Sequence, residues 1–253
     1  MSVVSSSTHL RDCGAEERRL REELAALYRL FHHYGWTDLI DTHLSARVPG
    51  TQDQYLINPY GLMFEEIRAS DLIRVDFNGK VLAGDHPFNR AGHLIHTAVL
   101  KARPEIDFVL HSHTRAGVAV SAMACGVLPL SQHAGIVLGT VAYHDYQQVT
   151  RAEDECELLG WDLGDNYLMV LRNHGLLACG RTAAEAFFYH YFLEMACKIQ
   201  VDVLAAGQDY VLPAGEAVAG LKAGGLPGDD PHGENYWPAL MRLVERRYPD
   251  YRD

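Results

Sequence analysis

Two histidines separated by one residue, His111 and His113, end a short apolar run that begins at Phe108. Side chains alternate between the two faces of a β-strand, so both imidazoles are expected to leave the same face. A third histidine, His174, follows a second apolar run over 167–171. Three imidazole nitrogens can hold a divalent metal and leave positions open for water or substrate. The pattern therefore predicts a metal centre of His111, His113 and His174.

Other histidines are weaker candidates because the chain has 14 of them. We expect these to be structural or solvated: His32, His33, His86, His133, His190 and His232. A His144-Asp145 dipeptide is weak support for a polar pair, since adjacent residues on a strand face opposite ways.

The elements that must position the three histidines are hairpin-linked strands with helices before and after them. Apolar periodicity and caps predict helices over 15–34, 89–101, 115–124, 153–159, 182–205 and 237–247. Alternation and turn signals predict strands over 39–48, 55–57, 73–77, 80–82, 108–113, 136–141, 167–171 and 176–179. The Gly- and Pro-rich stretch 213–233 is expected to be a surface loop. This order favours an α/β fold with a largely antiparallel sheet between helices, not repeated βαβ units.

The length of 253 residues and the lack of an internal linker predict one domain. We expect a flexible N-terminal tail over 1–14, the main domain over 15–207, and a C-terminal loop and short helix over 208–253 packing on it. A hydrophobic content of 48% with 22% charged residues fits a soluble globular protein with a large core.

The formal charge of −11 argues against nucleic acid or an anionic membrane as the main partner, because such binding needs clustered Lys and Arg. The sequence has no apolar stretch of membrane-spanning length and no signal-peptide pattern at its start, so a cytoplasmic location is expected. The five cysteines form no CxxC pair. Buried free thiols in a reducing compartment are the simplest interpretation.

A family resemblance rests on several motifs together. His111-Ser-His113, Arg172-Asn-His-Gly175 and His96 resemble the class II aldolase/adducin family. Four more segments resemble its adducin head-domain branch: Asn58-Pro-Tyr-Gly61, Ala119-Val-Ser-Ala122, Cys125-Gly-Val-Leu-Pro129 and Val141-Ala-Tyr-His-Asp-Tyr146. The similarity runs from about residue 15 to 205.

The resemblance implies a three-layer α/β/α sandwich around a mostly antiparallel sheet, assembled as a homotetramer with the site at a subunit interface. His111, His113 and His174 match the family's three metal ligands. In the family's sugar-phosphate aldolases, zinc polarises the substrate carbonyl. A glutamate one helical turn before the position of His96 acts there as acid and base. Here that position is Gly92.

The phosphate-binding residues of those aldolases are also replaced. Their Ser-Ser pair corresponds to Arg90-Ala91, their Thr-Gly to Tyr60-Gly61 and their Gly-Asn to Thr42-His43. Few donors for a phosphate dianion remain, although Arg90 can still pair with a carboxylate. An unphosphorylated small-molecule carbonyl compound or hydroxy-acid is therefore the expected substrate.

Three functions fit these residues. The first is a metal-dependent lyase of class II aldolase or decarboxylase type acting on an oxo- or hydroxy-acid. The second is a non-haem iron(II) oxygenase acting on an aryl-pyruvate or related acid, which suits three histidines without a carboxylate. The third is a noncatalytic, adducin-like interaction module, although the intact histidine set argues against it. The metal is accordingly zinc or iron(II) for the two enzymes.

The other site residues are less sharply defined by the sequence. Candidates for the missing base are His93, His43, Tyr143 or a tyrosine of an adjoining subunit. Candidates for substrate binding are Arg90, Tyr60, Gly61 and Trp237. Trp237 could fold over the site from the C-terminal segment, or could simply anchor a tail helix.

Overall fold

The computed structural model describes residues 13–146 and 153–253, so most of the predicted tail over 1–14 lies outside the described residues. One eight-stranded sheet forms the centre of the described chain, in the order β4-β3-β2-β1-β5-β8-β7-β6. Its strands are β1 (His43–Arg47), β2 (Gln54–Ile57), β3 (Ile73–Asp76), β4 (Val81–Ala83), β5 (Phe108–Ser112), β6 (Val141–His144), β7 (Leu168–Leu171) and β8 (Gly175–Gly180). Every neighbouring pair is antiparallel except β6 and β7, which are parallel.

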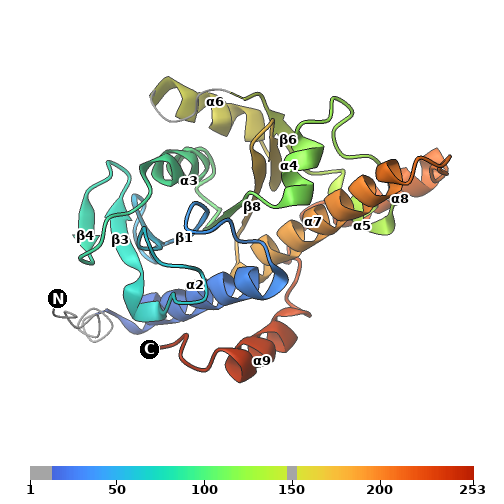
Figure 1. Ribbon diagram of the computed structural model, residues 1–253. Helices are drawn as coiled ribbons and strands as arrows, with labels where there is room; N and C mark the ends of the chain where they lie inside the picture. Colours follow the sequence, from blue (N-terminus) through green and yellow to red (C-terminus); the bar gives the residue numbers. More distant parts are fainter. Residues whose placement is uncertain (1–12, 147–152) are drawn as a thin grey trace.

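Helices cover both faces of this sheet, which confirms the predicted three-layer α/β/α sandwich. They are α2 (Ala15–Tyr34), α3 (Arg90–Ala102), α4 (Arg115–Ser121), α5 (Gln132–Val137), α6 (Glu153–Leu163), α7 (Ala183–Ala205), α8 (Gly215–Gly225) and α9 (Trp237–Arg247), with a 3₁₀ turn, η1 (Ala69–Asp71). Figure 1 shows α3 and α6 above the sheet and α2, α7 and α9 below it.

The register at the centre of the sheet decides which residues face α3. His43 of β1 lies opposite His111 of β5, and Ser45 lies opposite Val109. The alternate residues, such as Leu44, pack in the apolar core between the sheet and α2. One face of this strand pair is therefore apolar, while the other presents imidazoles towards α3.

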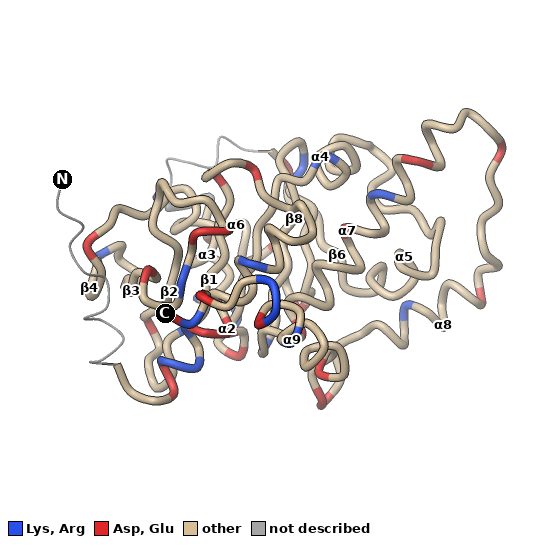
Figure 2. Tube along the Cα trace, turned by 60° about the horizontal axis from the view of Figure 1, so that its bottom comes forward, with Lys and Arg blue, Asp and Glu red and all other residues tan. Residues whose placement is uncertain are grey.

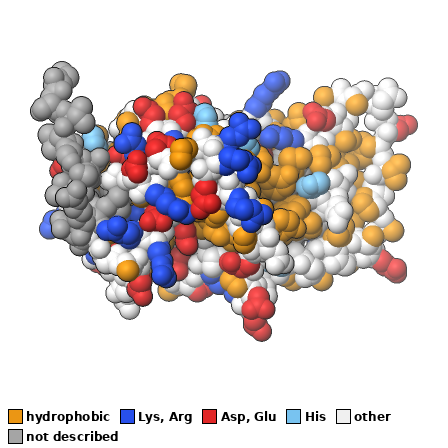
Figure 3. Space-filling model, turned by 90° about the horizontal axis from the view of Figure 1, so that it is seen from below, with side chains coloured by type: hydrophobic (Ala, Val, Ile, Leu, Met, Phe, Trp, Pro, Cys, Tyr) orange, Lys and Arg blue, Asp and Glu red, His pale blue; other side chains and the backbone are white. Residues whose placement is uncertain are grey.

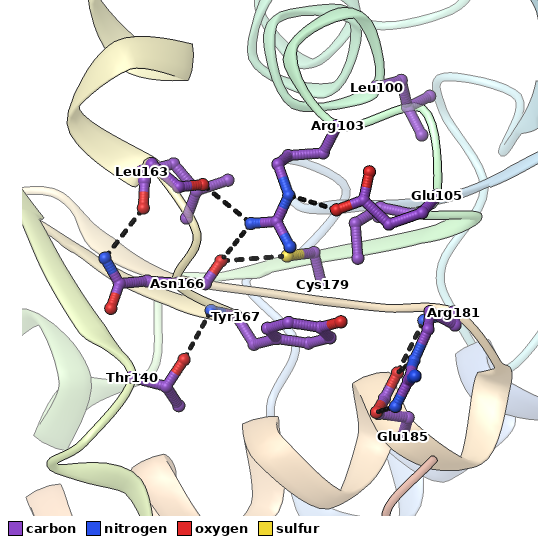
Figure 4. A network of polar contacts seen from close by, with 12 residues as sticks. Leu100, Arg103, Glu105, Thr140, Leu163, Asn166, Tyr167, Cys179, Arg181 and Glu185 are labelled. Atoms are coloured by element: carbon purple, nitrogen blue, oxygen red, sulfur yellow. Dashed lines mark hydrogen bonds and ion pairs between the residues drawn. The ribbon is translucent and has the colours of Figure 1, made fainter. Parts of the chain in front are cut away.

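Arg103 fixes the end of α3 against the strand that leads to His174 (Figure 4). Its guanidinium donates hydrogen bonds to the backbone carbonyls of Gly164 and Asn166, at 2.7 and 3.0 Å. It also pairs with Glu105 and lies over the Tyr167 ring, 5.2 Å from the centroid. Several charge-assisted bonds from one side chain thus join α3, the end of α6 and the start of β7.

The structure corrects three local predictions. Of the strand predicted over 136–141, only Val141 lies in a strand, β6; the rest is the end of α5 and a turn, because Ser131 caps a helix by accepting from the Ala134 amide. The strand predicted from residue 39 begins only at His43, since Leu39 has a left-handed backbone (φ 48°). The predicted loop over 213–233 contains α8, which packs on α5.

The cysteine prediction is correct only in part. Cys179 and Cys197 are buried, whereas Cys125 is exposed and the other two are intermediate. No disulfide joins any of the five cysteines in the described chain.

Charge and hydrophobic surface are distributed differently over the molecule. Figure 2 shows acidic and basic residues interspersed along the chain. Figure 3 shows hydrophobic side chains gathered towards the α7–α8 end of one face. A groove of about 210 Å³ on α7, lined mainly by aromatic residues, includes Phe188, Tyr191 and Tyr236. Among the described helices, none is long and apolar enough to cross a membrane.

Candidate metal centre

The three histidines predicted as ligands come together. His111 is on β5, His113 follows that strand directly, and His174 lies in the short turn between β7 and β8. The Nε2 atom of His113 lies 2.8 Å from Nε2 of His111 and 2.9 Å from Nε2 of His174. Each of the three histidines offers one ring nitrogen, and these three nitrogens lie within 4.8 Å of one another. In the described chain, this is the group of side chains that could hold a metal ion.

Hydrogen bonds on the far side of two rings determine which nitrogen carries the proton. His111 Nδ1 lies 3.0 Å from the Leu176 carbonyl oxygen, and His113 Nδ1 lies 3.0 Å from Asp38 Oδ2. Both partners are acceptors, so each Nδ1 donates, and each neutral ring has its lone pair on Nε2. Two Nε2 lone pairs 2.8 Å apart repel each other unless both bind one cation. The donor set therefore fits a bound metal ion.

Burial keeps two of these imidazoles, those of His111 and His174, unprotonated. Burial holds the pKa of His111 well below its ordinary value of 6.5, and the surrounding histidines lower it further. Burial and then His113 lower the pKa of His174 to about 4. Neutral imidazole is the form that binds a metal, so the surroundings favour ligation at neutral pH.

Asp38 is a residue of the candidate site that the sequence reasoning missed. It lies in the loop between α2 and β1, half-exposed, and its carboxylate accepts from His113. A carboxylate behind a ligating histidine fixes the ring and raises its basicity. The available signal was the position of Asp38 shortly before β1, the strand that pairs with the histidine strand.

A fourth imidazole lies beside the centre. The ring of His43 stacks on that of His111 with centroids 5.0 Å apart and planes 27° apart. His43 Nδ1 is 2.8 Å from Nε2 of His96, and His96 Nδ1 contacts the Ser45 hydroxyl. Burial, followed by His96, holds the pKa of His43 well below its ordinary value. Of the predicted base candidates, His43 lies against a candidate metal ligand, His111.

The other two base candidates lie elsewhere on the chain. His93 Nδ1 is 2.7 Å from the Tyr55 hydroxyl, on the side of α3 that faces α6. The Tyr143 hydroxyl bonds the Val127 amide, and its ring lies under Arg172. Among the described residues, neither has a hydrogen bond or ring contact with the three ligands. Their catalytic assignments stay predictions.

The predicted substrate-binding residues are spread over three places. Arg90 lines an open cleft of about 1050 Å³ between α3 and α6, which none of the three ligands lines. Tyr60 is 42% exposed and its hydroxyl lies 3.4 Å from Asp41, while the adjacent Gly61 has a φ of 109°. Trp237 packs against the apolar core that lies between the sheet and α2. Their substrate-binding roles also stay predictions.

His144 pairs with a different acid from the neighbour that the sequence offered. Its Nδ1 lies 2.7 Å from Oδ2 of Asp162 on α6, so its acidic partner is Asp162 and not the adjacent Asp145. The pair joins β6 to α6, so its position supports a structural role.

Comparison with known proteins identifies the family. The family model described as "Class II Aldolase and Adducin N-terminal domain" matches residues 22–201. The chain belongs to the class II aldolase and adducin family. All three histidines and the strands that carry them lie inside the matched region.

Three relatives show the range of this family. The chain is 44% identical to an aldolase II superfamily protein from Pseudomonas syringae, whose crystal structure matches with a TM-score of 0.90 over 96% of this chain and 98% of that one. It is 26% identical to the L-fuculose 1-phosphate aldolase from Glaciozyma antarctica PI12, with a TM-score of 0.78 over 98% and 96% of the two chains. It is also 40% identical to mouse (Mus musculus) alpha-adducin, over 94% of this chain but 36% of adducin. The family thus includes aldolases and adducins.

Proposed function

We propose that this protein is a metal-dependent lyase that cleaves a carbon–carbon bond in an unphosphorylated oxo- or hydroxy-acid. The convergence of three Nε2 atoms, two of them with tautomers set by acceptors behind the rings, carries this proposal. The fold similarity to an L-fuculose 1-phosphate aldolase supports the aldolase type of chemistry. A cytoplasmic location and a tetramer with an interfacial site belong to the same proposal.

His111, His113 and His174 would hold the ion, which is zinc or iron(II). When bound, such an ion acts as a Lewis acid that polarises a carbonyl oxygen. The chain's own part is to keep the rings of His111 and His174 neutral by burial and to orient His111 and His113 through Leu176 and Asp38. Three protein ligands leave open coordination positions for a substrate.

The substrate class follows from the residues near the phosphate positions of the family aldolases. Tyr60 uses its hydroxyl on Asp41, and Thr42 is buried with a hydroxyl that has no partner among the described residues. Asp38 and Asp41 lie with Thr42 in the loop between α2 and β1. A phosphate dianion bound there would be repelled by the two carboxylates. An unphosphorylated acid with one carboxylate is the better fit, and Arg90 is the candidate cation for it.

His43 is the residue that we assign to proton transfer. It is 2% exposed, lies against His111, and is connected through His96 to Ser45. A general base must lie within hydrogen-bond reach of the proton that it takes. His93 and Tyr143 remain candidates with weaker geometric support.

Metal analysis, followed by activity assays with and without oxygen, tests this function. Protein purified without added metal is expected to contain about one zinc or iron(II) per chain. Incubation with 2-oxo and hydroxy acids under argon is expected to release pyruvate or an aldehyde. A chain that holds no transition metal after purification and takes up none on titration would contradict the proposal.

The two alternative functions are outcomes of the same experiment. Oxygen uptake with 4-hydroxyphenylpyruvate-type acids, together with no product under argon, would replace the lyase by an iron oxygenase. Absence of metal binding would favour a noncatalytic module like that considered for the adducin relatives. The complete ligand set with its oriented tautomers favours an enzyme over that module.

A further inference from the structure

Gly92 has an unusual setting in α3, because the space beside it is already filled. A Cβ atom built on Gly92 would lie 2.5 Å from Cδ2 of His43 and 2.7 Å from its Cγ and Nε2. Real Cβ atoms do not approach other atoms this closely. Any side chain at position 92 would therefore have to displace the His43 ring.

The His43 ring cannot move away cheaply. It is buried on β1, hydrogen-bonded to His96 and stacked on His111 on the opposite strand. Ser45 holds His96 from its other nitrogen. The ring is thus held from two sides, and Gly92 forms the wall on a third.

Backbone conformation does not explain this glycine. Gly92 is not among the residues with positive φ and lies in the first turn of α3, where the Asn89 side chain accepts from its amide. Alanine is favoured over glycine inside a helix by about 1 kcal/mol. The reason for glycine at position 92 must therefore be the close approach of His43.

We propose that Gly92 and His43 form a matched pair that positions the metal ligand His111. Glycine at 92 admits the imidazole of His43, and that imidazole stacks against the His111 ring. His43 is in this role a positioning residue, whether or not it also transfers a proton. The metal part of this inference rests on the proposed function, whereas the packing part does not.

A double-mutant cycle tests the pair with four proteins: wild type, Gly92→Ala, His43→Ala and the double variant. Coupled neighbours show non-additive effects in such a cycle. In the wild-type background, Gly92→Ala is expected to lower the melting temperature of the metal-free protein. In the His43→Ala background, the same substitution is expected to raise it, because only the helix preference remains. The sign change is the signature of the pair.

Gly220→Ala is the matched control. Gly220 also lies inside a helix, α8, but a Cβ there would meet nothing within 4 Å. We expect this substitution to raise the melting temperature or leave it unchanged in both backgrounds. If His43→Ala does not fold, His43→Asn replaces it in the cycle.

Metal binding supplies the second readout. Gly92→Ala is expected to weaken zinc binding by about tenfold or more, the usual effect of disturbing a residue that orients a ligand. It should also change the visible absorption spectrum of the cobalt(II)-substituted protein, which a purely structural loss would leave intact. His43→Phe, which keeps a stacking ring, should retain more zinc affinity than His43→Ala.

The melting cycle and the metal-binding measurements test different parts of the proposal. Equal effects of Gly92→Ala on melting in both backgrounds would overturn the matched pair. A sign change in melting with an unaltered zinc affinity and cobalt spectrum would overturn the positioning role. A wild-type protein that binds no metal would defeat the proposed function and the positioning role, while the melting cycle would still decide the packing.

Discussion

The two sides of α3 differ in what they present. Towards β1 the helix presents Gly92 and His96, which are buried against His43. Towards α6 it presents Arg90 and Lys101 to an open cleft of about 1050 Å³. A volume of that order is typical of ligand sites, yet the three candidate metal ligands lie on the other, filled side. Converging lone pairs, not empty volume, indicate the chemistry of this protein.

The histidines on the two sides of α3 also have different hydrogen-bond partners. His96 bonds both of its ring nitrogens, to His43 and Ser45, and belongs to the wall of the metal centre. His93, three residues earlier, bonds the Tyr55 hydroxyl and borders the cleft. The same residue type one helical turn apart therefore serves two separate surroundings. Substitutions on each side can test this difference.

The largest effect is expected from removing a ligand. His113→Ala should abolish stoichiometric metal binding while the fold is kept, because two Nε2 atoms hold an ion far less well than three. Elemental analysis and circular dichroism measure the two properties. The exposed His86 provides a control, since His86→Ala should keep its metal. Retention of one metal per chain in the His113 variant would refute the ligand assignment.

The next largest effect is expected at the carboxylate behind His113. Asp38→Ala should weaken zinc binding about 10–100-fold, because His113 loses the acceptor that sets its tautomer. Competition with a chromogenic chelator measures the affinity. Asp41→Ala, in the same loop, removes a carboxylate bonded to Tyr60 and should have a smaller effect. Equal losses from both variants would mean a general effect of loop charge.

A third prediction concerns the pH dependence of stability in metal-free protein. Burial first, then Arg90 and Lys101, lowers the pKa of His93 to about 4. Between the ordinary value of 6.5 and about 4, the unfolded chain takes a proton at this residue and the folded chain does not. The free energy of unfolding should therefore fall as the pH drops through this window, by up to about 1.4 kcal/mol per pH unit from this group.

Urea unfolding at pH 7 and pH 5, with a chelator present, measures that slope. His93→Gln should make the slope shallower, because its contribution is lost. His86→Gln, at an exposed histidine, is the matched control and should leave the slope unchanged. An unchanged slope in His93→Gln would show that His93 is accessible to protons in the folded state.

The smallest effect on metal binding is expected on the cleft side. Lys101→Ala and Trp161→Ala, which alter the cleft between α3 and α6, should change zinc affinity by no more than about twofold. The same chelator competition measures this. A tenfold loss of zinc affinity in either variant would mean that the two sides of α3 are energetically coupled.

The sequence allowed much of this architecture to be predicted, for identifiable reasons. Strong helical periodicity placed α2 at residues 15–34 and α9 at 237–247, and strand alternation placed His111 and His113 on one face. The third predicted ligand, His174, was recognised because it follows a second apolar run, over 167–171. Each of these signals is local, and the tertiary structure agrees with it.

What could not be predicted depends on tertiary contacts. The run over 136–141 is rich in β-branched residues, but the Ser131 cap and packing against α7 and α8 make its first part a helix. The role of Gly92 needed the distance to His43, 49 residues earlier in the sequence, and Asp38 needed the path of a loop. Spacing in a sequence gives the direction of a side chain, whereas its partners come from the folded chain.

The short turn that carries His174 has a further consequence. His113 and His174 are 61 positions apart, and Asn173 has a left-handed backbone (φ 55°) just before the second of them. An ion bound to both would act as a cross-link that closes this stretch into a loop, which lowers the entropy of the unfolded chain. That stretch includes α4, α5 and β6. Chelation should therefore expose this half of the protein to proteases before the half built on β1 to β4.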